Sequence, residues 1–245
     1  MENEASRILE RAESAGVTMR LIGALAFQRQ CPKFNHLRQA MGRVLSDLDF
    51  AAKSKQWDLV VDLVTDMGYS FDERRAMLHG NDRVIFFHAN GFRVDIFFDR
   101  LDMCHIVNFR ERLDIDRETI SVTDLFLEKV QIIELTRKDV IDTIVLLREH
   151  DVGSSELGLN IDYLASIFRD DWGFYYTATE NLNYIRKEAL REFEVLEDKD
   201  RSIVRRRIEA MVERFKAEPK TQKWRIRAAI GPRIRWYKDV GELAR

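Results

Sequence analysis

The first half of the chain alternates between helical and extended hydrophobic periodicity. Apolar residues recur at helical spacing from Ala5 to Ala12, and Gly16 follows where that helix should end. The same pattern predicts a helix through Phe27 and another over residues 57–67, closed by Gly68. Extended runs alternate with these helices, and they predict strands at residues 18–24, 46–51, 83–88 and 92–98.

The last two predicted strands are separated only by Ala89-Asn90-Gly91, an Asn-Gly turn of the kind that joins antiparallel strands. From about residue 121 the pattern is helical almost to the end. We therefore place a domain boundary near residue 118, with residues 1–118 as an α/β (α+β) domain and residues 119–245 as an all-helical domain.

The composition excludes several classes of protein. The chain has 245 residues, of which 45% are hydrophobic, and this is enough to bury one large core or two modest ones. No apolar run reaches the roughly 18 residues of a membrane span, and the start of the chain lacks signal-peptide order. Cys31 and Cys104 match no metal-binding spacing. We expect a cytoplasmic protein without a membrane partner, a zinc site or disulfides.

The net charge of −2 conceals an uneven distribution. Residues 201–245 carry fourteen Lys and Arg against five Asp and Glu, which is +9, whereas residues 1–200 carry 26 against 37, which is −11. Such a division favours an anionic partner at the C-terminal end.

Three aspartates stand where strands are predicted. Asp47 and Asp49 are two residues apart, so on a strand both side chains project from one face, with Cα atoms about 6.6 Å apart. Asp95 lies inside the apolar run 92–98 and shares the polar face of that strand with Arg93. Close, buried carboxylates need a cation, and Mg²⁺ or Mn²⁺ prefers such oxygen ligands. The alternative is that Asp47 and Asp49 lie in solvent and that Asp95 pairs with Arg93.

These residues resemble the motifs of the DNA-polymerase-beta-like nucleotidyltransferase superfamily, which has a glycine motif after its first strand, then Asp-x-Asp, then a third Asp. Here the motifs are Ile22-Gly23-Ala24, Asp47-Leu48-Asp49 and Asp95. The segments 125–131 and 137–142 are similar to the third and fourth motifs of AbiEii-type nucleotidyltransferases, the toxin half of a phage-defence and toxin–antitoxin system. The resemblance covers about residues 5–150.

Two features depart from the pattern. The family more often has Gly-Ser or Gly-Gly where this chain has Gly23-Ala24, and the gap from Gly23 to Asp47 is longer than usual, which predicts an inserted loop around residues 32–43.

The resemblance implies a nucleotidyltransferase fold with a small mixed sheet flanked by helices. It also implies transfer of NMP from an NTP, with release of pyrophosphate. Asp47 and Asp49 would hold the ion that bridges the triphosphate, and Asp95 a second ion. The resemblance assigns six further residues to nucleotide binding: Gly23, Ala24, Lys129, Arg137, Lys138 and Asp142.

Structural roles compete with some of these assignments. Thr136 and Asp139 fit a helix-capping box, and Lys129 could be a solvated lysine. The basic tail mixes cations with aromatic residues, which suits nucleic-acid binding but also suits packing on the same protein. The tail residues concerned are Trp224, Arg225, Arg227, Arg233, Arg235, Trp236 and Tyr237.

The acceptor is predicted to be RNA, such as a tRNA, or a protein, and a cognate antitoxin is a possible partner. Two alternatives stay open. One is a small-molecule nucleotidyltransferase of the kind that modifies an aminoglycoside, and the other is a non-catalytic nucleotide- or RNA-binding module.

Overall fold

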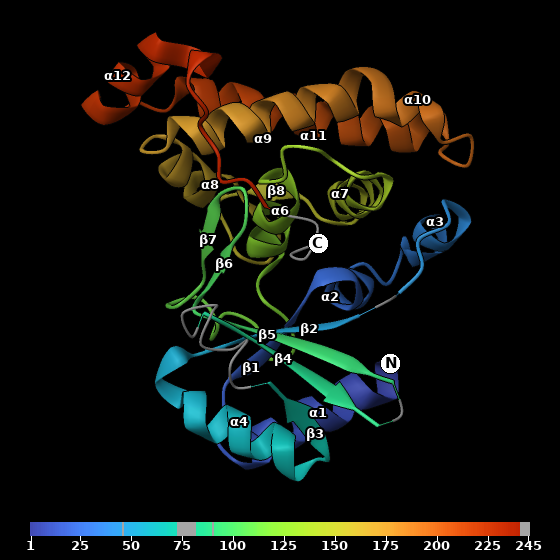
Figure 1. Cartoon of the computed structure of the whole chain (residues 1–245). Coiled ribbons are helices and arrows are strands. Elements are labelled where there is room, and N and C mark those ends of the chain that lie inside the picture. The colour runs from blue at the N-terminus through green and yellow to red at the C-terminus, as the bar shows by residue number, and fades with distance from the viewer. Residues whose placement is uncertain (46, 73–81, 90, 241–245) are drawn as a thin grey trace. The chain divides into compact units, whose positions relative to one another are not determined.

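The computed structural model describes residues 1–45, 47–72, 82–89 and 91–240, and the chain divides into two compact units (Figure 1). Unit 1 comprises Met1–Gln30, Val44–Leu101 and Val107–Leu125. Unit 2 comprises Cys31–Arg43, Asp102–Ile106 and Phe126–Arg245. The chain therefore leaves unit 1 and returns to it twice before it enters unit 2 for the last time.

The units differ in detail from the division into residues 1–118 and 119–245. The segments Cys31–Arg43 and Asp102–Ile106 were not expected to belong with the helical half. The predicted division concerns domains that fold separately, and it stays a prediction.

Unit 1 is built on a five-stranded mixed sheet, which confirms the predicted fold class at this level. The strand order is β1-β2-β5-β4-β3, with β2 and β5 parallel and the other neighbours antiparallel (Figure 1). The strands are β1 (Met19–Ile22), β2 (Leu48–Ala52), β3 (Tyr69–Phe71), β4 (Arg83–His88) and β5 (Arg93–Phe98).

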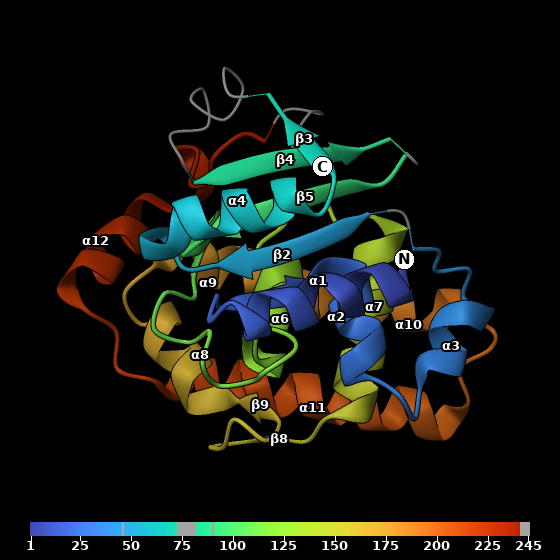
Figure 2. The same cartoon turned by 90° about the horizontal axis from the view of Figure 1, so that it is seen from below.

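One face of this sheet is apolar and covered. Alternate residues of β2 and β5 point to it and are fully buried, as the period of two requires; they are Leu48, Phe50, Val94, Ile96 and Phe98. Helices α1 (Glu2–Ser14) and α4 (Trp57–Asp66) cover this face, and Trp57 packs on Phe98 with ring centroids 4.3 Å apart (Figures 1 and 2). Helix α2 (Gly23–Gln30) lies on the opposite face, over β1 and β2.

Several helices and strands of unit 1 have bounds that differ from the predicted ones. The first strand ends at Ile22, so Gly23 and Ala24 begin α2 instead of completing the strand. Strand β2 begins at Leu48, which leaves Asp47 just before it. Ser46 and Asn90, parts of a predicted strand and of the predicted turn, lie outside the described residues. Strand β3 was not predicted, because three residues are too few to show a period.

The prediction of an inserted loop around residues 32–43 is also wrong in part. Residues 35–40 form a short helix, α3 (Asn35–Ala40), and two short strands form a separate two-stranded sheet, β6 (Arg100–Asp102) and β7 (Ile106–Asn108). A 3-10 turn, η1 (Ser54–Gln56), precedes α4.

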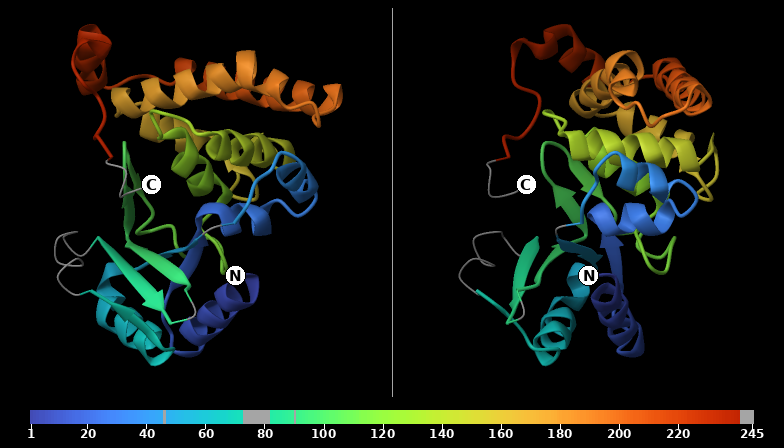
Figure 3. Two further views of the ribbon diagram at one scale, coloured as in Figure 1. Left: turned by 45° about the vertical axis from the view of Figure 1, so that its right-hand side comes forward. Right: turned by 90° about the vertical axis from the view of Figure 1, so that its right-hand side faces the viewer.

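Unit 2 is helical, as predicted. Its long elements run side by side, with α11 against α9 and the turn that follows α9 (Figure 3). The elements of the second half are α6 (Val122–Val130), α7 (Arg137–Glu149), β8 (Val152–Gly153), β9 (Leu159–Asn160), α8 (Ile161–Phe168), α9 (Trp172–Tyr184), a π-helical turn η2 (Ile185–Ala189), α10 (Leu190–Glu192), α11 (Asp198–Ala217), α12 (Gln222–Ile230) and η3 (Gly231–Arg233).

Aromatic packing fills the core of unit 2. The Phe168 ring meets Phe174 and Phe215 edge to face, with centroids 5.2 and 4.8 Å away. His105 stacks on Phe174 at 4.9 Å, and its Nε2 is 2.8 Å from the hydroxyl of Thr177. Burial lowers the pKa of His105 to about 4, although the charge of Asp171 acts in the other direction.

A helix with the length and hydrophobicity of a membrane span is absent from the part of the chain that the structure describes.

Candidate functional site

Asp49 and Asp95 are direct partners across the parallel strands β2 and β5. Partners in register project from the same face of a sheet, so the two carboxylates stand side by side on the face opposite α1 and α4. Asp47 lies two residues before Asp49 and is exposed. The structure thus brings Asp49 and Asp95 together, while Asp47 stands outside the strand that was expected to hold it.

Gly23 lies directly against Asp49. Its φ of +65° is a conformation that side-chain-bearing residues rarely adopt. A Cβ atom at Gly23 would lie 2.5 Å from Oδ2 of Asp49, closer than real Cβ atoms come. Glycine is therefore required here for its backbone and for space. The resemblance assigns Gly23 to nucleotide binding, and in this structure it is packed against a carboxylate.

The Asp95 carboxylate is neutralised by two arginines. The side chain is only 4% exposed. Nε and Nη2 of Arg93 each donate to it at 2.8 Å, and Nη2 of Arg83 donates to Oδ2. The pairing with Arg93 is the alternative that the sequence left open. Arg83 was missed, although its place on β4 opposite Phe97 puts it on the same face.

The pKa of Arg93 is affected by all three aspartates. Its hydrogen bonds with Asp95 raise the pKa of the guanidinium, burial lowers it, and the charges of Asp95, Asp47 and Asp49 raise it further. The three carboxylates thus lie within electrostatic reach of one cation. Their clustering around an ion stays a prediction.

The carboxylates fit a divalent cation in donor chemistry. Asp49 and Asp95 offer hard oxygen ligands from adjacent strands, which is what Mg²⁺ or Mn²⁺ prefers. As they stand, however, no three His, Cys, Asp or Glu side chains lie close enough together to hold an ion anywhere in the described ranges. Both oxygens of Asp95 accept from arginine. A cation would therefore have to replace arginine contacts.

A second charged cluster, in unit 2, surrounds Asp142 of α7. This carboxylate is completely buried. Nε of Arg38 donates to it at 3.1 Å, and Nη2 of Arg43 at 3.0 Å. Neither arginine was singled out from the sequence, because both lie in the segment expected to be an inserted loop. An acid one turn into a helix, with arginines far away in the chain, carries no local signal of such a pair.

Lys129 belongs to the same cluster. Its Nζ is 3.0 Å from Glu128 and 3.6 Å from both Asp139 and Asp142. Burial acts to lower the pKa of Lys129, but the charges of Glu128, Asp142 and Asp139 outweigh it and raise the pKa above its usual range. The solvated-lysine alternative is therefore wrong. Phosphate binding by Lys129 stays a prediction.

The first turn of α7 shows the expected capping box. The Asp139 carboxylate accepts from the Thr136 backbone at 3.0 Å, and the Thr136 hydroxyl accepts from the Asp139 backbone. The guanidinium of Arg137 lies over the Phe193 ring, 4.4 Å from its centroid, which gives this cation a structural partner. Lys138 is exposed.

The aromatic residues of the tail pack on α9. Nε1 of Trp236 donates to Thr177 at 3.0 Å, and the Trp224 ring meets Tyr175 edge to face at 5.4 Å. Arg227 lies over Trp172, 4.5 Å from its ring centroid. The packing role is thus present for the aromatics. The arginines that remain exposed are Arg225, Arg233 and Arg235, and their binding of nucleic acid stays a prediction.

A pocket of about 500 Å³ lies elsewhere on unit 1. Its lining includes Glu10, Arg20, Arg29 and Glu118, and none of the candidate residues above. Comparison with protein-family models found no match, and comparison with curated proteins found none either.

Proposed function

We propose that this chain is a metal-dependent nucleotidyltransferase of the polymerase-beta-like fold, which transfers NMP from an NTP to an acceptor. One observation carries the proposal. Asp49 and Asp95 stand in register on adjacent parallel strands, and Gly23 at the start of α2 is packed against Asp49. A glycine at the start of a helix, beside carboxylates on adjacent strands, suits a site for a cation and a triphosphate.

In the proposed reaction the oxygen of an acceptor hydroxyl attacks the α-phosphorus of the NTP. The bond from that phosphorus to the oxygen shared with the β-phosphate breaks, pyrophosphate leaves with the electron pair, and the hydroxyl proton passes to solvent or to Asp95. Bound Mg²⁺ or Mn²⁺ would neutralise the phosphate charge during the displacement. Asp47, Asp49 and Asp95 would hold the ions.

The residues of unit 2 contribute unequally to this proposal. Lys138 is exposed, and the guanidinium of Arg137 lies over the Phe193 ring. For both cations we propose contact with a triphosphate. Lys129 and Asp142 already take part in buried ion pairs. For Asp142 we propose the support of α7 ahead of direct contact with base, ribose or acceptor. For Lys129 we propose contact with the triphosphate in addition to its neutralisation of Asp142.

We further propose an RNA acceptor, such as a tRNA, over a protein. The basic C-terminal segment supports it, because exposed Arg225, Arg233 and Arg235 could neutralise phosphates. On the sheet, Phe87 is 45% exposed and lies opposite Arg93 in register, on the same face as the aspartates. An exposed ring beside a cation suits base stacking. A role as a toxin with a cognate antitoxin is proposed from the resemblance alone.

A second candidate is a nucleotide-binding module without turnover. It is favoured by one observation, the occupation of both Asp95 oxygens by arginine. Nucleotide binding without pyrophosphate release would identify it.

The test is incubation of the full chain with each NTP, labelled at the α-phosphate, together with Mg²⁺ and either total tRNA or an RNase-treated cell lysate. We expect label on RNA and release of pyrophosphate. Label on protein would change the acceptor, and label on a small molecule would favour the aminoglycoside-like alternative. Absence of label with every NTP and acceptor would contradict the proposed activity.

A further inference from the structure

The pocket of about 500 Å³ in unit 1 lies along one edge of the five-stranded sheet. Strand β1 forms that edge, and helix α1 runs beside it (Figure 1). The segment 118–120 pairs with the outer side of β1 at Leu21. Three residues just before Leu21 line the pocket, namely Thr18, Met19 and Arg20. The pocket therefore continues along the strand edge from the place where this segment stops pairing.

The backbone N–H of Met19 points away from β2, toward the pocket. In an antiparallel pair, successive residues direct their N–H groups alternately to the partner strand and to the outer side. Leu21 uses its outer side for the segment 118–120, so Met19, two residues earlier in the same register, also faces outward. Met19 is buried, and its N–H has no hydrogen-bond partner in the described part of the chain. Because buried N–H groups without an acceptor are rare, an acceptor oxygen belongs at this place.

Two arginines line the pocket beside the segment 116–118. The guanidinium of Arg20 donates to the backbone oxygens of Asp116 and Met19, the latter at 2.7 Å. Arg117 is exposed, and neither arginine forms an ion pair with a carboxylate in the described ranges. Burial lowers the pKa of Arg20, and the charge of Arg117 lowers it further, although nearby carboxylates raise it. An anion here would neutralise two like charges that stand close together.

The wall formed by α1 has the opposite charge. Glu10 and Glu13 line the pocket three residues apart, so they share one face of the helix. Both are exposed, and neither pairs with a cation among the residues that the structure describes. The pocket continues past them to Gly16, where an added Cβ atom would have nothing within 4 Å. This end is therefore open, with carboxylates leading to it.

We infer that this pocket binds the C-terminal end of an extended peptide. A peptide laid along the β1 edge presents a carbonyl oxygen to the Met19 N–H, as in the addition of a strand to a sheet. The segment 118–120 occupies the edge beyond that point, so the peptide has to end there. The group at its end lies beside Arg20 and Arg117, which suits a terminal carboxylate and opposes a terminal amine.

The rest of the pocket limits the peptide in length and charge. A volume of about 500 Å³ is in the range of small-ligand pockets and holds only a few residues of a peptide. Glu10 and Glu13 favour a Lys or Arg side chain before the terminal residue. The inference does not rest on the proposed function, since the pocket contains none of the residues of the aspartate site.

The test titrates the tetrapeptide Thr-Val-Lys-Val, with a free carboxylate, into the isotope-labelled full chain. The Met19 amide resonance should shift and exchange more slowly with water, because a peptide oxygen accepts from it. The same peptide with an amidated C-terminus should bind about tenfold more weakly, since a hydrogen-bonded charge is lost. This measurement uses the wild type and does not depend on the folding of a variant.

Variants locate the two charged walls. Arg20→Gln should abolish the preference for the free carboxylate over the amide, an effect that an arginine with only a structural role does not produce. Glu13→Gln should weaken binding of both peptides about two- to fivefold, because exposed ion pairs contribute little.

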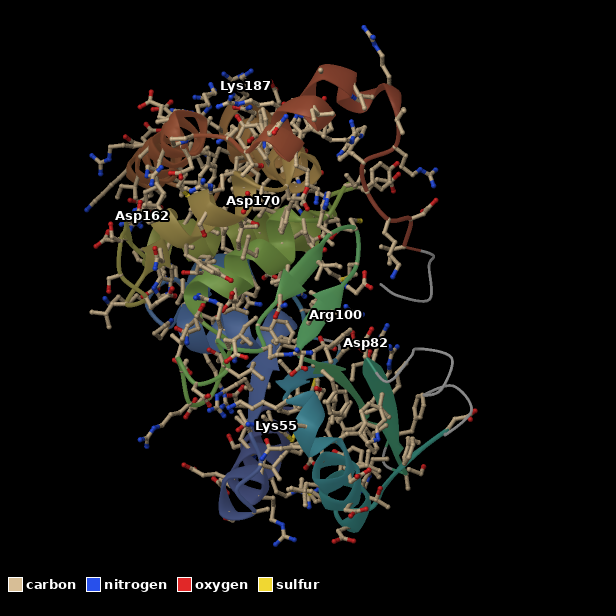
Figure 4. The ribbon with its side chains drawn as sticks, turned by 90° about the vertical axis from the view of Figure 1, so that its left-hand side faces the viewer. Lys55, Asp82, Arg100, Asp162, Asp170 and Lys187 are labelled. Atoms are coloured by element: carbon tan, nitrogen blue, oxygen red, sulfur yellow. The ribbon has the colours of Figure 1, made fainter. Side chains whose placement is uncertain are left out.

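Arg100 offers a matched control for Arg20. It belongs to the same unit, does not line the pocket and pairs with Asp82, toward which its side chain points in Figure 4. Arg100→Gln should leave the preference for the carboxylate unchanged. A Met19 amide that does not respond to about 10 mM of either peptide would overturn the inference, because water alone would then fill the pocket. Equal binding of carboxylate and amide by the wild type would also overturn it.

Discussion

Two buried aspartates, Asp95 in unit 1 and Asp142 in unit 2, have similar immediate partners. Each accepts hydrogen bonds from two arginines, Arg83 and Arg93 for the first and Arg38 and Arg43 for the second. Their surroundings differ. Asp95 stands beside another carboxylate, and one of its arginines is partly in solvent. Around Asp142 both arginines are buried, and Lys129 adds a third cation.

The two aspartates differ in how far their arginine partners are exposed to water. A partly solvated arginine can leave at modest cost, because water replaces its contacts. A buried arginine that leaves would strand two charges in a medium of low polarity. We therefore expect that loss of a partner costs more stability at Asp142 than at Asp95. The following predictions test that contrast.

The largest expected effect is on activity. Asp49→Asn should lower pyrophosphate release by about 100- to 1,000-fold or more, because it removes a charge from the proposed cation site at nearly constant volume. The melting temperature should change little. Asp58→Asn, at an exposed position on α4, is the control. Near wild-type release in Asp49→Asn at saturating Mg²⁺ would show that Asp49 does not belong to an active centre.

The next effect is on stability. Asp142→Asn should lower the free energy of unfolding by about 3–5 kcal/mol, as is typical when one partner of a buried ion pair is removed. Asp95→Asn should cost less, since Arg93 can turn to water. Urea unfolding of both variants measures the difference. Equal losses would remove this contrast between a partly solvated and a buried counter-ion.

A third prediction concerns His105, another buried polar side chain of unit 2. The pKa of His105 is lowered to about 4, so the folded protein holds this histidine neutral where an unfolded chain, with a pKa near 6.5, is protonated. The neutral His105 therefore contributes up to about 3 kcal/mol to the free energy of unfolding. This contribution is fully present above about pH 6.5 and is lost as the pH falls toward 4.

His105→Phe should remove this dependence, because the ring would still pack on Phe174 without binding a proton. Unfolding free energies of both proteins between pH 7 and pH 4 provide the test. Parallel pH profiles would mean that solvent reaches His105 in the folded state.

The smallest effect should come from the edge of the Asp142 cluster. Asp139→Ala removes a capping box and should cost about 0.5–2 kcal/mol, with nucleotide affinity unchanged. Lys129→Ala should instead weaken NTP binding. Thermal melting and nucleotide titration of the two variants separate these roles. If Lys129→Ala keeps its nucleotide affinity, Lys129 serves only to neutralise Asp142.

Features that depend on residues close together in the sequence could be predicted. The alternation in 92–98 placed Asp95 and Arg93 on one face, and the glycines at 16 and 68 marked the ends of α1 and α4. The Thr136–Asp139 box was also predictable, because its two partners are three residues apart.

Long-range pairing was not predictable in this way. Register between strands decides that Arg83 reaches Asp95, and no local pattern encodes which strands become neighbours. Arg38 and Arg43 were hidden in a polar stretch whose composition suits a loop. The tail aromatics were ambiguous for a related reason, since Trp224 and Trp236 suit stacking on a base as well as packing on α9.

The segment Cys31–Arg43 belongs to unit 2 although the chain on both sides of it belongs to unit 1, and this affects folding during synthesis. Arg38 and Arg43 are synthesised 104 and 99 residues before Asp142, the carboxylate they pair with. Because chains fold as they emerge and distant contacts form late, the contacts of this segment with Asp142 form only after α7 has been synthesised. A fragment that ends near residue 118 would carry Arg38 and Arg43 without Asp142. The N-terminal half should therefore be harder to produce alone than the whole chain.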